Sequence, residues 1–386
     1  MLQTAVEKLL RRLALVLFAR AHTRCAEEQG EDKQICEKTR LHCGNVKRTK
    51  MVIFLLKTTI FAQIQRLSMR RILISAIAAL FLTGCAGEQY IMLQGFAQGG
   101  TYEVKCKVGD ASARQAASLK EGIDSILDVI DRSVSGYNPA SLLSRYNDGQ
   151  DIPEDGSAES GVFTSLTAYG DSLFLATDGA LDTRAAELFD IWGFGFKNGR
   201  MPDPTAIEAA RHDRNKLNFN AIAQGYSADM VASYLRKQGI TDMMVNIGGE
   251  IFCSGLNPKG ERWTLGIDKP FDGNMAPGKD LSGKFEVPSE RLHGVVTSGN
   301  YRKFYIVDGV KYSHTIDPRT GYPVKHNLLS ATVMAPDATL ADAVATYCMV
   351  IGPEQARDFI ESRDDLEACL ISDDGMWCSE GFILNQ

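Results

Sequence analysis

Glycines and other turn residues end most of the short segments into which this chain divides after about residue 95. Met243 to Gly255 has the pattern of a buried strand, a glycine pair and a second strand, while Ser112 to Ser133 carries apolar residues at helical spacing. Such ends lie at Gly179, Gly193, Gly225, Gly248-Gly249, Ser298-Gly299 and Gly321. Because glycine lets a backbone approach a ligand closely, these ends together favour one large ligand with a phosphate part.

Strand-like and helix-like segments are mixed along this region, so we expect an α+β (mixed α/β) fold. Neither a G-x-G-x-x-G nor a Walker A pattern is present, and neither a Rossmann nor a P-loop interpretation is supported. The net charge of −6 argues against a broad nucleic-acid-binding surface. None of the nine cysteines forms a C-x-x-C pair, which argues against zinc. In an exported protein a disulfide such as Cys369 with Cys378 is an option that the sequence does not fix.

Asp342 and Thr346 stand four residues apart in a segment that we predict to be helical, so their side chains share one face. A carboxylate and a hydroxyl on one face suit Mg²⁺, which prefers oxygen ligands. Upstream, a strand from Lys303 to Val307 and a hairpin at Asp308-Gly309 lead to a tight turn that holds His314, Asp317, Arg319 and Thr320. This order predicts a phosphate-handling site. The alternative is that Asp342 and Thr346 lie on an ordinary solvated helix face.

A secretory signal precedes the predicted fold. Met69-Arg70-Arg71 is followed by the apolar run ILISAIAALF, and Leu82-Thr83-Gly84-Cys85 comes after it. The last four residues resemble a bacterial lipoprotein box, which implies that Cys85 is lipid-modified and begins the mature chain. The alternative is a membrane anchor or a buried helix, but the run is well short of the roughly 20 apolar residues that span a bilayer.

Residues 1–68 show no link to the rest of the chain. We expect translation to start at Met69, so that 1–68 come from an over-extended gene model; the rival is a cytoplasmic extension with two membrane-associating segments. The predicted layout is then a signal peptide over 69–84, a tether over 85–94 and one catalytic domain over 95–386.

Six sequence blocks occur in a fixed order: LDTRAAELFDIWGFG, NFNAIAQGYSAD, VNIGGEI, TSGNYRKFY, HTIDPRTGYPV and ADAVATYCMVIG. Together they resemble the ApbE family of bacterial flavin transferases, the FAD:protein FMN transferases, over about residues 90–386. The resemblance implies two closely packed α/β subdomains with an FAD and Mg²⁺ site between them. It also implies cleavage of FAD, esterification of FMN onto a Thr or Ser of a target protein, and export as a lipoprotein to the extracytoplasmic, periplasmic side of the cell membrane.

The resemblance assigns roles to single residues. It implies metal binding by Asp342, Thr346 and the backbone carbonyl of Ala221, and catalytic roles for Asp342 and His314. The positions that it implies for FAD contact are Gln98, Tyr137, Ala180, Leu181, Asp182, Asn218, Gln224 and Ile316. Asn218 stands where many relatives have Asp, Gln224 where many have Lys, and Leu181 replaces Phe; Gln98 stands near a position that is often Met. We interpret these departures as subfamily variation.

The role of His314 stays open between accepting the acceptor proton, orienting the phosphate and packing against the turn. Asp317 and Arg319 are predicted to stabilise that turn, and Trp192 and Phe194 to be core residues. Three functions remain: a flavin transferase, a metal-dependent FAD pyrophosphatase giving FMN and AMP, and a flavin-binding lipoprotein without turnover. For the first, the resemblance implies a membrane redox-complex subunit or another exported flavoprotein as the acceptor.

Overall fold

The computed structural model describes residues 89–109, 112–153, 155–194, 201–272, 274, 278–288, 290–291, 293–301, 304–307 and 309–385. The chain divides into two units, Met1–Cys85 and Ala86–Gln386, and every described residue belongs to the second. The predicted extension over 1–68, the predicted signal peptide over 69–84 and Cys85 with its predicted lipid lie outside the described residues.

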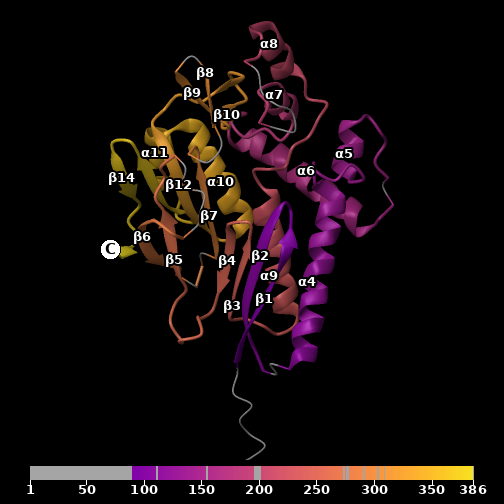
Figure 1. Cartoon of the computed structure of the whole chain (residues 1–386), viewed down its shortest axis with the longest axis vertical. Coiled ribbons are helices and arrows are strands. Elements are labelled where there is room, and N and C mark those ends of the chain that lie inside the picture. Colours follow the sequence, from indigo (N-terminus) through magenta and orange to yellow (C-terminus); the bar gives the residue numbers. More distant parts are fainter. Residues whose placement is uncertain are drawn as a thin grey trace, which may run out of the picture. The chain divides into compact units, whose positions relative to one another are not determined.

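One eight-stranded sheet runs through the described unit, in the order β1-β2-β3-β4-β7-β12-β13-β14 (Figure 1). Every neighbouring pair in it is antiparallel. Its strands are β1 (Gln89–Ala97), β2 (Gly100–Val108), β3 (Met243–Ile247), β4 (Glu250–Ser254), β7 (Gly294–Gly299), β12 (Leu328–Ala335), β13 (Glu367–Ser372) and β14 (Gly375–Cys378). An antiparallel sheet joined to helices confirms the predicted α+β class, and the two expected subdomains share this single sheet.

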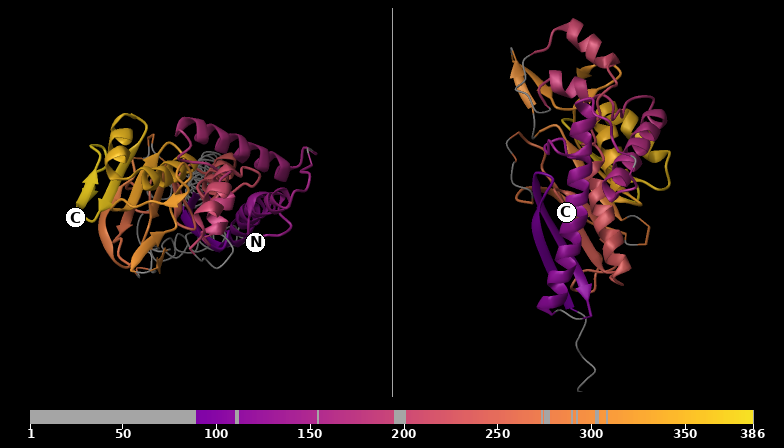
Figure 2. Two further views of the ribbon diagram at one scale, coloured as in Figure 1. Left: turned by 90° about the horizontal axis from the view of Figure 1, so that it is seen from above. Right: turned by 90° about the vertical axis from the view of Figure 1, so that its right-hand side faces the viewer.

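Helices cover one face of this sheet. Apolar side chains of α4 (Ala113–Val134) and α9 (Ala223–Lys237) pack on β1 to β4, and those of α10 (Ala338–Ile351) and α11 (Pro353–Glu361) pack on β7, β12 and β13. Figure 2 shows α4 running alongside the β1–β2 hairpin. The predicted helix after Ser112 is confirmed, because the Ser112 hydroxyl caps its first turn. Among the helices of the described residues, none is long and apolar enough to cross a bilayer.

A small sheet covers the other face. It has the order β15-β6-β5, with β5 (Thr264–Asp268), β6 (Leu281–Glu286) and β15 (Leu384–Asn385). β6 belongs to the core, because Phe285 is 1% exposed and packs on Phe382 with ring centroids 4.5 Å apart. The Gly and Pro around β6 hid a strand of only six residues.

The predicted tether over 85–94 was also wrong from residue 89 onward. Gln89–Ala97 is β1, and it forms a hairpin with β2 through the two-residue turn Gln98-Gly99. Both turn residues have positive φ, 53° and 76°, as a tight hairpin turn requires. The chain from Gln89 to Val108 is therefore two strands joined by this turn. The alternation of β1 was obscured because its outward positions are apolar too: Met92 is 54% and Phe96 88% exposed.

The remaining helices and short strands lie outside the large sheet, and two of them, α5 (Leu142–Asn147) and α6 (Ala158–Ala176), pack against α4. Trp192 is fully buried among α7, α8 and β10, and its indole N–H donates to the Gly321 carbonyl at 2.8 Å; Figure 1 shows α7 and α8 near β8 to β10. The predicted hairpin after Lys303 is confirmed, with Val307 opposite Val310. These elements are α5 (Leu142–Asn147), α6 (Ala158–Ala176), α7 (Ala186–Ile191), α8 (Pro204–His212), β8 (Phe304–Val307), β9 (Val310–Ser313), β10 (Ile316–Asp317) and β11 (Tyr322–Pro323).

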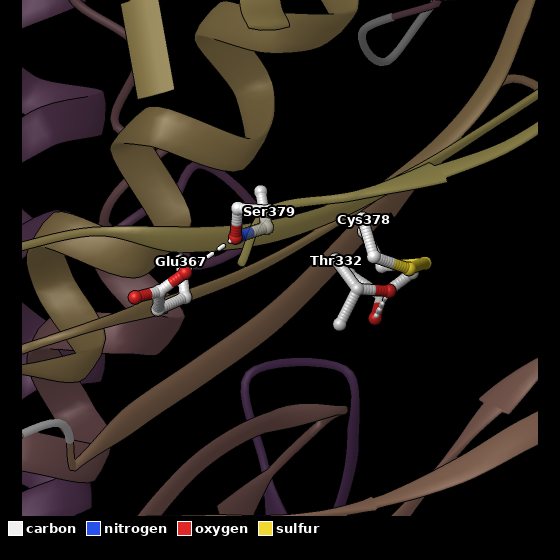
Figure 3. Close-up of a disulfide and its surroundings, with 7 residues drawn as sticks. Thr332, Glu367, Cys378 and Ser379 are labelled. Atoms are coloured by element: carbon white, nitrogen blue, oxygen red, sulfur yellow. Dashed lines mark hydrogen bonds between the residues drawn. A yellow bond between two sulfur atoms is a disulfide. The ribbon is translucent and has the colours of Figure 1, made fainter. Parts of the chain in front are cut away.

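A disulfide joins Cys369 to Cys378, the pairing that the sequence left as one option. The two cysteines face each other across β13 and β14, with Cα atoms 4.1 Å apart. Figure 3 shows it beside Thr332, with the Glu367 carboxylate nearby accepting from the Ser379 hydroxyl at 2.5 Å. The bond therefore ties the last strand of the large sheet to the strand beside it.

Candidate functional site

Asp342 lies in the second turn of α10, as predicted, and is 4% exposed. Its carboxylate accepts a hydrogen bond from the backbone N–H of Gly225 at 3.1 Å. Burial raises the pKa of Asp342 to about 7; the Gly225 N–H opposes that rise, and the neighbouring Asp229 carboxylate adds to it. A buried carboxylate beside a second carboxylate is stabilised by a proton or by a cation.

Gly225 allows α9 and α10 to approach closely enough for this hydrogen bond. A methyl group in its place would lie 2.3 Å from the Ala338 carbonyl oxygen and 2.9 Å from Cβ of Asp342. Gly225 is also in the first turn of α9, where backbone N–H groups have no partner within their own helix. The Asp342 carboxylate supplies that partner from α10.

Thr346 follows Asp342 by one helical turn and confirms the predicted shared face of α10. Its hydroxyl lies 3.5 Å from the hydroxyl of Ser298, near the end of β7. Asp342, Thr346, Ser298 and the Ala221 carbonyl offer only oxygen atoms. The described residues contain no group of three or more His, Cys, Asp or Glu that could hold a metal. A single carboxylate with neutral oxygens suits Mg²⁺, which usually keeps water and substrate phosphates in its shell.

Two of the positions expected to contact FAD are found at the first half of α9: Gln224 is part of this helix, and Gln98 contacts it. The Gln98 amide donates to the hydroxyl of Ser227. On the same helix, Gln224 packs against the β3–β4 turn, where a methyl group on Gly248 would lie 2.2 Å from Nε2 of Gln224. The Gly248 N–H, in the β3–β4 turn, donates to the carbonyl of Thr101 in β2 at 3.1 Å. Glycine at 248 thus permits a close approach of the Gln224 side chain to the β3–β4 turn.

A second group of expected FAD positions consists of Ala180, Leu181 and Asp182. Its neighbour Thr183 is bonded to Asn218, which precedes α9 in the chain. The Asn218 N–H donates to the Thr183 carbonyl at 2.7 Å. The side chains of Ala180 and Leu181 are buried in the core, so only their backbone could face a ligand. The carboxylate of Asp182 binds the guanidinium of Arg214, with 3.1 Å between Oδ1 and one of its nitrogens.

The other predicted site residues come from separate loops. Tyr137 lies between α4 and α5 and is 68% exposed. His314 follows β9 and is half-buried, with its ring edge-on to Phe194 at 6.4 Å between centroids. Ile316, in β10, has its side chain in the same core as Trp192, and β10 packs on α10.

The turn after His314 is held by the predicted pair. The Arg319 guanidinium donates to both carboxylate oxygens of Asp317 at 2.9 Å, and the Gly321 N–H donates to the Asp317 carbonyl at 2.8 Å. Directly after His314, the Thr315 hydroxyl donates to Oδ1 of Asn300 at 2.6 Å, and directly before it Ser313 pairs with Phe304 of β8. His314 therefore lies between two anchored residues.

Sequence reasoning missed Arg214 and the structural part played by Gly225 and Asp229, and it marked Ser298 only as part of the segment end Ser298-Gly299. The spacing of Gly225 and Asp229, four residues apart in a helical segment, was a signal that they share a face. Arg214 had no such signal, because its partner Asp182 lies 32 residues away in a loop.

Comparisons with known proteins show the family and the fold class of this chain. A profile of the ApbE family matches residues 99–370. The FAD:protein FMN transferase of Escherichia coli K12 is 32% identical over 347 residues, covering 79% of this chain and 94% of that protein. The structure of a flavin transferase ApbE from Vibrio cholerae is 30% identical, with a TM-score of 0.63 and coverage of 77% of this chain and 100% of that one. The apo flavinyl transferase ApbE of Pseudomonas stutzeri is 29% identical, with a TM-score of 0.64 over 76% and 94% of the two chains.

Proposed function

This chain belongs to the ApbE family, and on that premise we propose that it is an FAD:protein FMN transferase. It cleaves FAD, joins FMN through a phosphoester bond to a Thr or Ser of a target flavoprotein, and releases AMP. The observation that carries this proposal within the fold is the buried carboxylate of Asp342. Within the described part of the chain, that carboxylate has a backbone N–H and a second carboxylate as neighbours but no paired cationic side chain.

We propose Mg²⁺ as the cation, held by Asp342, Thr346 and the Ala221 carbonyl, with Ser298 beside Thr346. When bound, it neutralises the negative charge that develops on the pyrophosphate. The oxygen of the acceptor hydroxyl forms a bond to the FMN phosphorus, and the bond from that phosphorus to the bridging oxygen breaks. AMP leaves with the bridging oxygen. Alignment of these groups supplies most of the rate.

We propose that His314 accepts the proton of the acceptor hydroxyl. Its segment is fixed by the Thr315–Asn300 hydrogen bond and the Asp317–Arg319 pair. The imidazole of a histidine can serve as a general base. We expect His314→Gln to lower kcat by about 100-fold or more and to leave the affinity for FAD unchanged. An unchanged kcat would remove His314 from the proton transfer.

The decisive experiment incubates the full chain with FAD, Mg²⁺ and a protein domain that carries a candidate acceptor Thr. The expected result is a mass gain of one FMN on the acceptor, with stoichiometric AMP. Asp342→Ala is expected to abolish both products. AMP and FMN released with no adduct on any acceptor tried would favour the FAD pyrophosphatase instead. FAD binding without AMP would favour the flavin-binding lipoprotein.

We also propose that the mature protein begins at Cys85 and is held at the membrane by a lipid on that residue, with the enzyme on the extracytoplasmic side. The signal pattern before Cys85 supports this, and it fits an acceptor that is a membrane redox-complex subunit or an exported flavoprotein. Intact mass of the native protein tests it. A lipid-sized increment on Cys85 is expected, and a Cys85→Ser protein that stays in the membrane fraction would contradict the proposal.

A further inference from the structure

We propose that Asp229 is a positioning residue that fixes α10 against α9, so that Asp342 and Thr346 are held in a metal-binding arrangement. This inference rests on the proposed metal role of those two residues. Asp229 is placed in α9, one turn after Gly225, and it touches neither of the proposed ligands by a hydrogen bond.

The carboxylate of Asp229 binds the first turn of α10 with three hydrogen bonds. Oδ1 accepts from the Ala338 N–H at 2.9 Å, and Oδ2 accepts from the Thr339 N–H at 2.8 Å and the Thr339 hydroxyl at 2.5 Å. The first N–H groups of a helix have no partner within the helix. Asp229 supplies that partner from another helix, and it thereby sets where α10 begins.

Gly225 and Asp229 together make a two-point attachment between the helices. Gly225 holds Asp342 through its N–H, and Asp229 holds the helix one turn earlier, at Ala338 and Thr339. One contact alone would leave α10 free to turn about it. Two contacts a helical turn apart fix both the rotation of α10 about its axis and its position along that axis. A metal site needs its ligands held to within about 0.5 Å. Loss of Asp229 should therefore weaken metal binding even though Asp342 remains.

Asp337 is a matched control, because it caps the same helix from within the same segment. Its Oδ1 accepts from the Leu340 N–H at 2.7 Å. Loss of either cap should lower the free energy of unfolding, and for Asp337→Ala we expect a loss of about 1 kcal/mol. Only the loss of Asp229 removes a bond between α9 and α10, so an effect on metal binding confined to Asp229 separates positioning from helix stability.

Asp229→Glu separates positioning from charge. It keeps the negative charge near Asp342 but adds one methylene group, which moves the carboxylate away from the α10 amides. A hollow of about 460 Å³, lined by Tyr169, Tyr226, Asp229, Asp337 and Thr339 among others, lies beside the side chain and can admit the longer one. The variant is therefore expected to fold. A purely electrostatic role predicts that it binds metal as the wild type does.

The experiment titrates the full-length protein with Mn²⁺ at about pH 8, above the raised pKa values of both carboxylates. It follows the free-ion signal by electron paramagnetic resonance, with thermal unfolding as a check of folding. We expect Asp229→Ala and Asp229→Glu to raise the Kd about tenfold or more, as loss of supporting groups around metal sites typically does. Asp337→Ala should stay within about twofold of wild type, since it leaves the bonds between α9 and α10 in place. Asp229→Glu at the wild-type Kd, or Asp337→Ala as weak as Asp229→Ala, would overturn the inference.

Asp342→Ala distinguishes this failure from failure of the proposed function. If the wild type binds Mn²⁺ and Asp342→Ala does not, the proposed metal site stands and the Asp229 variants decide the inference alone. If the wild type binds Mn²⁺ no better than Asp342→Ala, the metal role of Asp342 is overturned, and the positioning role of Asp229 with it.

Discussion

The backbone N–H of Gly225 donates to the carboxylate of Asp342 across 3.1 Å, joining helices whose residues lie 117 positions apart in the chain. This bond gives a first-turn N–H of α9, which has no partner within its own helix, an acceptor on α10. It therefore places the buried carboxylate of Asp342 at the start of α9, with Thr346 one turn further along α10. The site depends on the absence of a side chain at position 225 as much as on the groups that are present.

Gly225→Ala is expected to disrupt this junction. Its methyl group would lie 2.3 Å from the Ala338 carbonyl, so α9 and α10 must move apart, at a cost of about 1–3 kcal/mol of unfolding free energy and with loss of FMN transfer. Urea unfolding and the transfer assay measure the two effects. Gly161→Ala is the control, since Gly161 is also helical but a methyl group there meets nothing within 4 Å. It should be neutral or stabilising by up to about 1 kcal/mol. Equal stability of the two variants would contradict the close-packing argument.

The sequence predicted well what depends on local pattern. The shared face of Asp342 and Thr346 follows from their spacing, and the helical segment around them was recognisable. The tight turn that carries Asp317 and Arg319 follows from the chemistry of single turn residues. Each of these features is decided by residues within about four positions of one another.

The features that sequence missed depend on distant partners or on both faces of an element. The sequence predicts a tether where β1 lies, because the exposed face of β1 carries Met92 and Phe96. These two side chains obscure the alternation of apolar and polar residues that is typical of a strand. β6 was hidden because its burial comes from Phe382, far along the chain near the C-terminus. The pairing of Asp229 with Thr339 spans 110 positions. No single-sequence pattern encodes such contacts.

Thr346 allows the proposed metal ligands to be tested without disturbing the fold. Thr346→Val keeps the shape of the side chain but removes the hydroxyl, so we expect at least a roughly tenfold weaker metal affinity, the loss typical of supporting groups. Thr346→Ser keeps the hydroxyl and should stay within a few-fold of wild type. The dependence of the transfer rate on Mg²⁺ concentration measures both. Indistinguishable Mg²⁺ curves for the two variants would remove Thr346 from the set of ligands.

The metal-free protein should lose stability as the pH rises from about 4 to about 7. Burial raises the pKa of Asp342 from 3.8 to about 7 and that of Asp229 to about 6. The folded state then keeps protons that the unfolded state has released, so the free energy of unfolding falls with pH in this window and levels off above it. Each group contributes a slope of at most about 1.4 kcal/mol per pH unit.

Urea unfolding in EDTA across about pH 4.5 to 8 measures this slope, and Asp342→Asn should flatten it. Mg²⁺ should oppose the loss, because cation binding requires the deprotonated carboxylate. The stabilisation by Mg²⁺ is therefore expected to grow as the pH rises toward about 7. An Asp342→Asn protein with the wild-type slope would show that the raised pKa of Asp342 is not its source.

The Cys369–Cys378 disulfide should contribute stability on the face of the large sheet opposite α10. It joins β13 to β14 across nine residues of chain, and a loop of that size is worth about 2–3 kcal/mol when closed. We expect the double variant Cys369→Ala with Cys378→Ala to lose about that much unfolding free energy and to keep Mg²⁺ affinity. Reductant should lower the unfolding free energy of the wild type by a similar amount and leave that of the double variant unchanged.

The free cysteine Cys106 gives a control for these experiments. Burial raises the pKa of its thiol to about 11, so that cysteine should not respond to mild alkylation in the folded protein. A double variant that remained sensitive to reductant would place the redox effect at another cysteine.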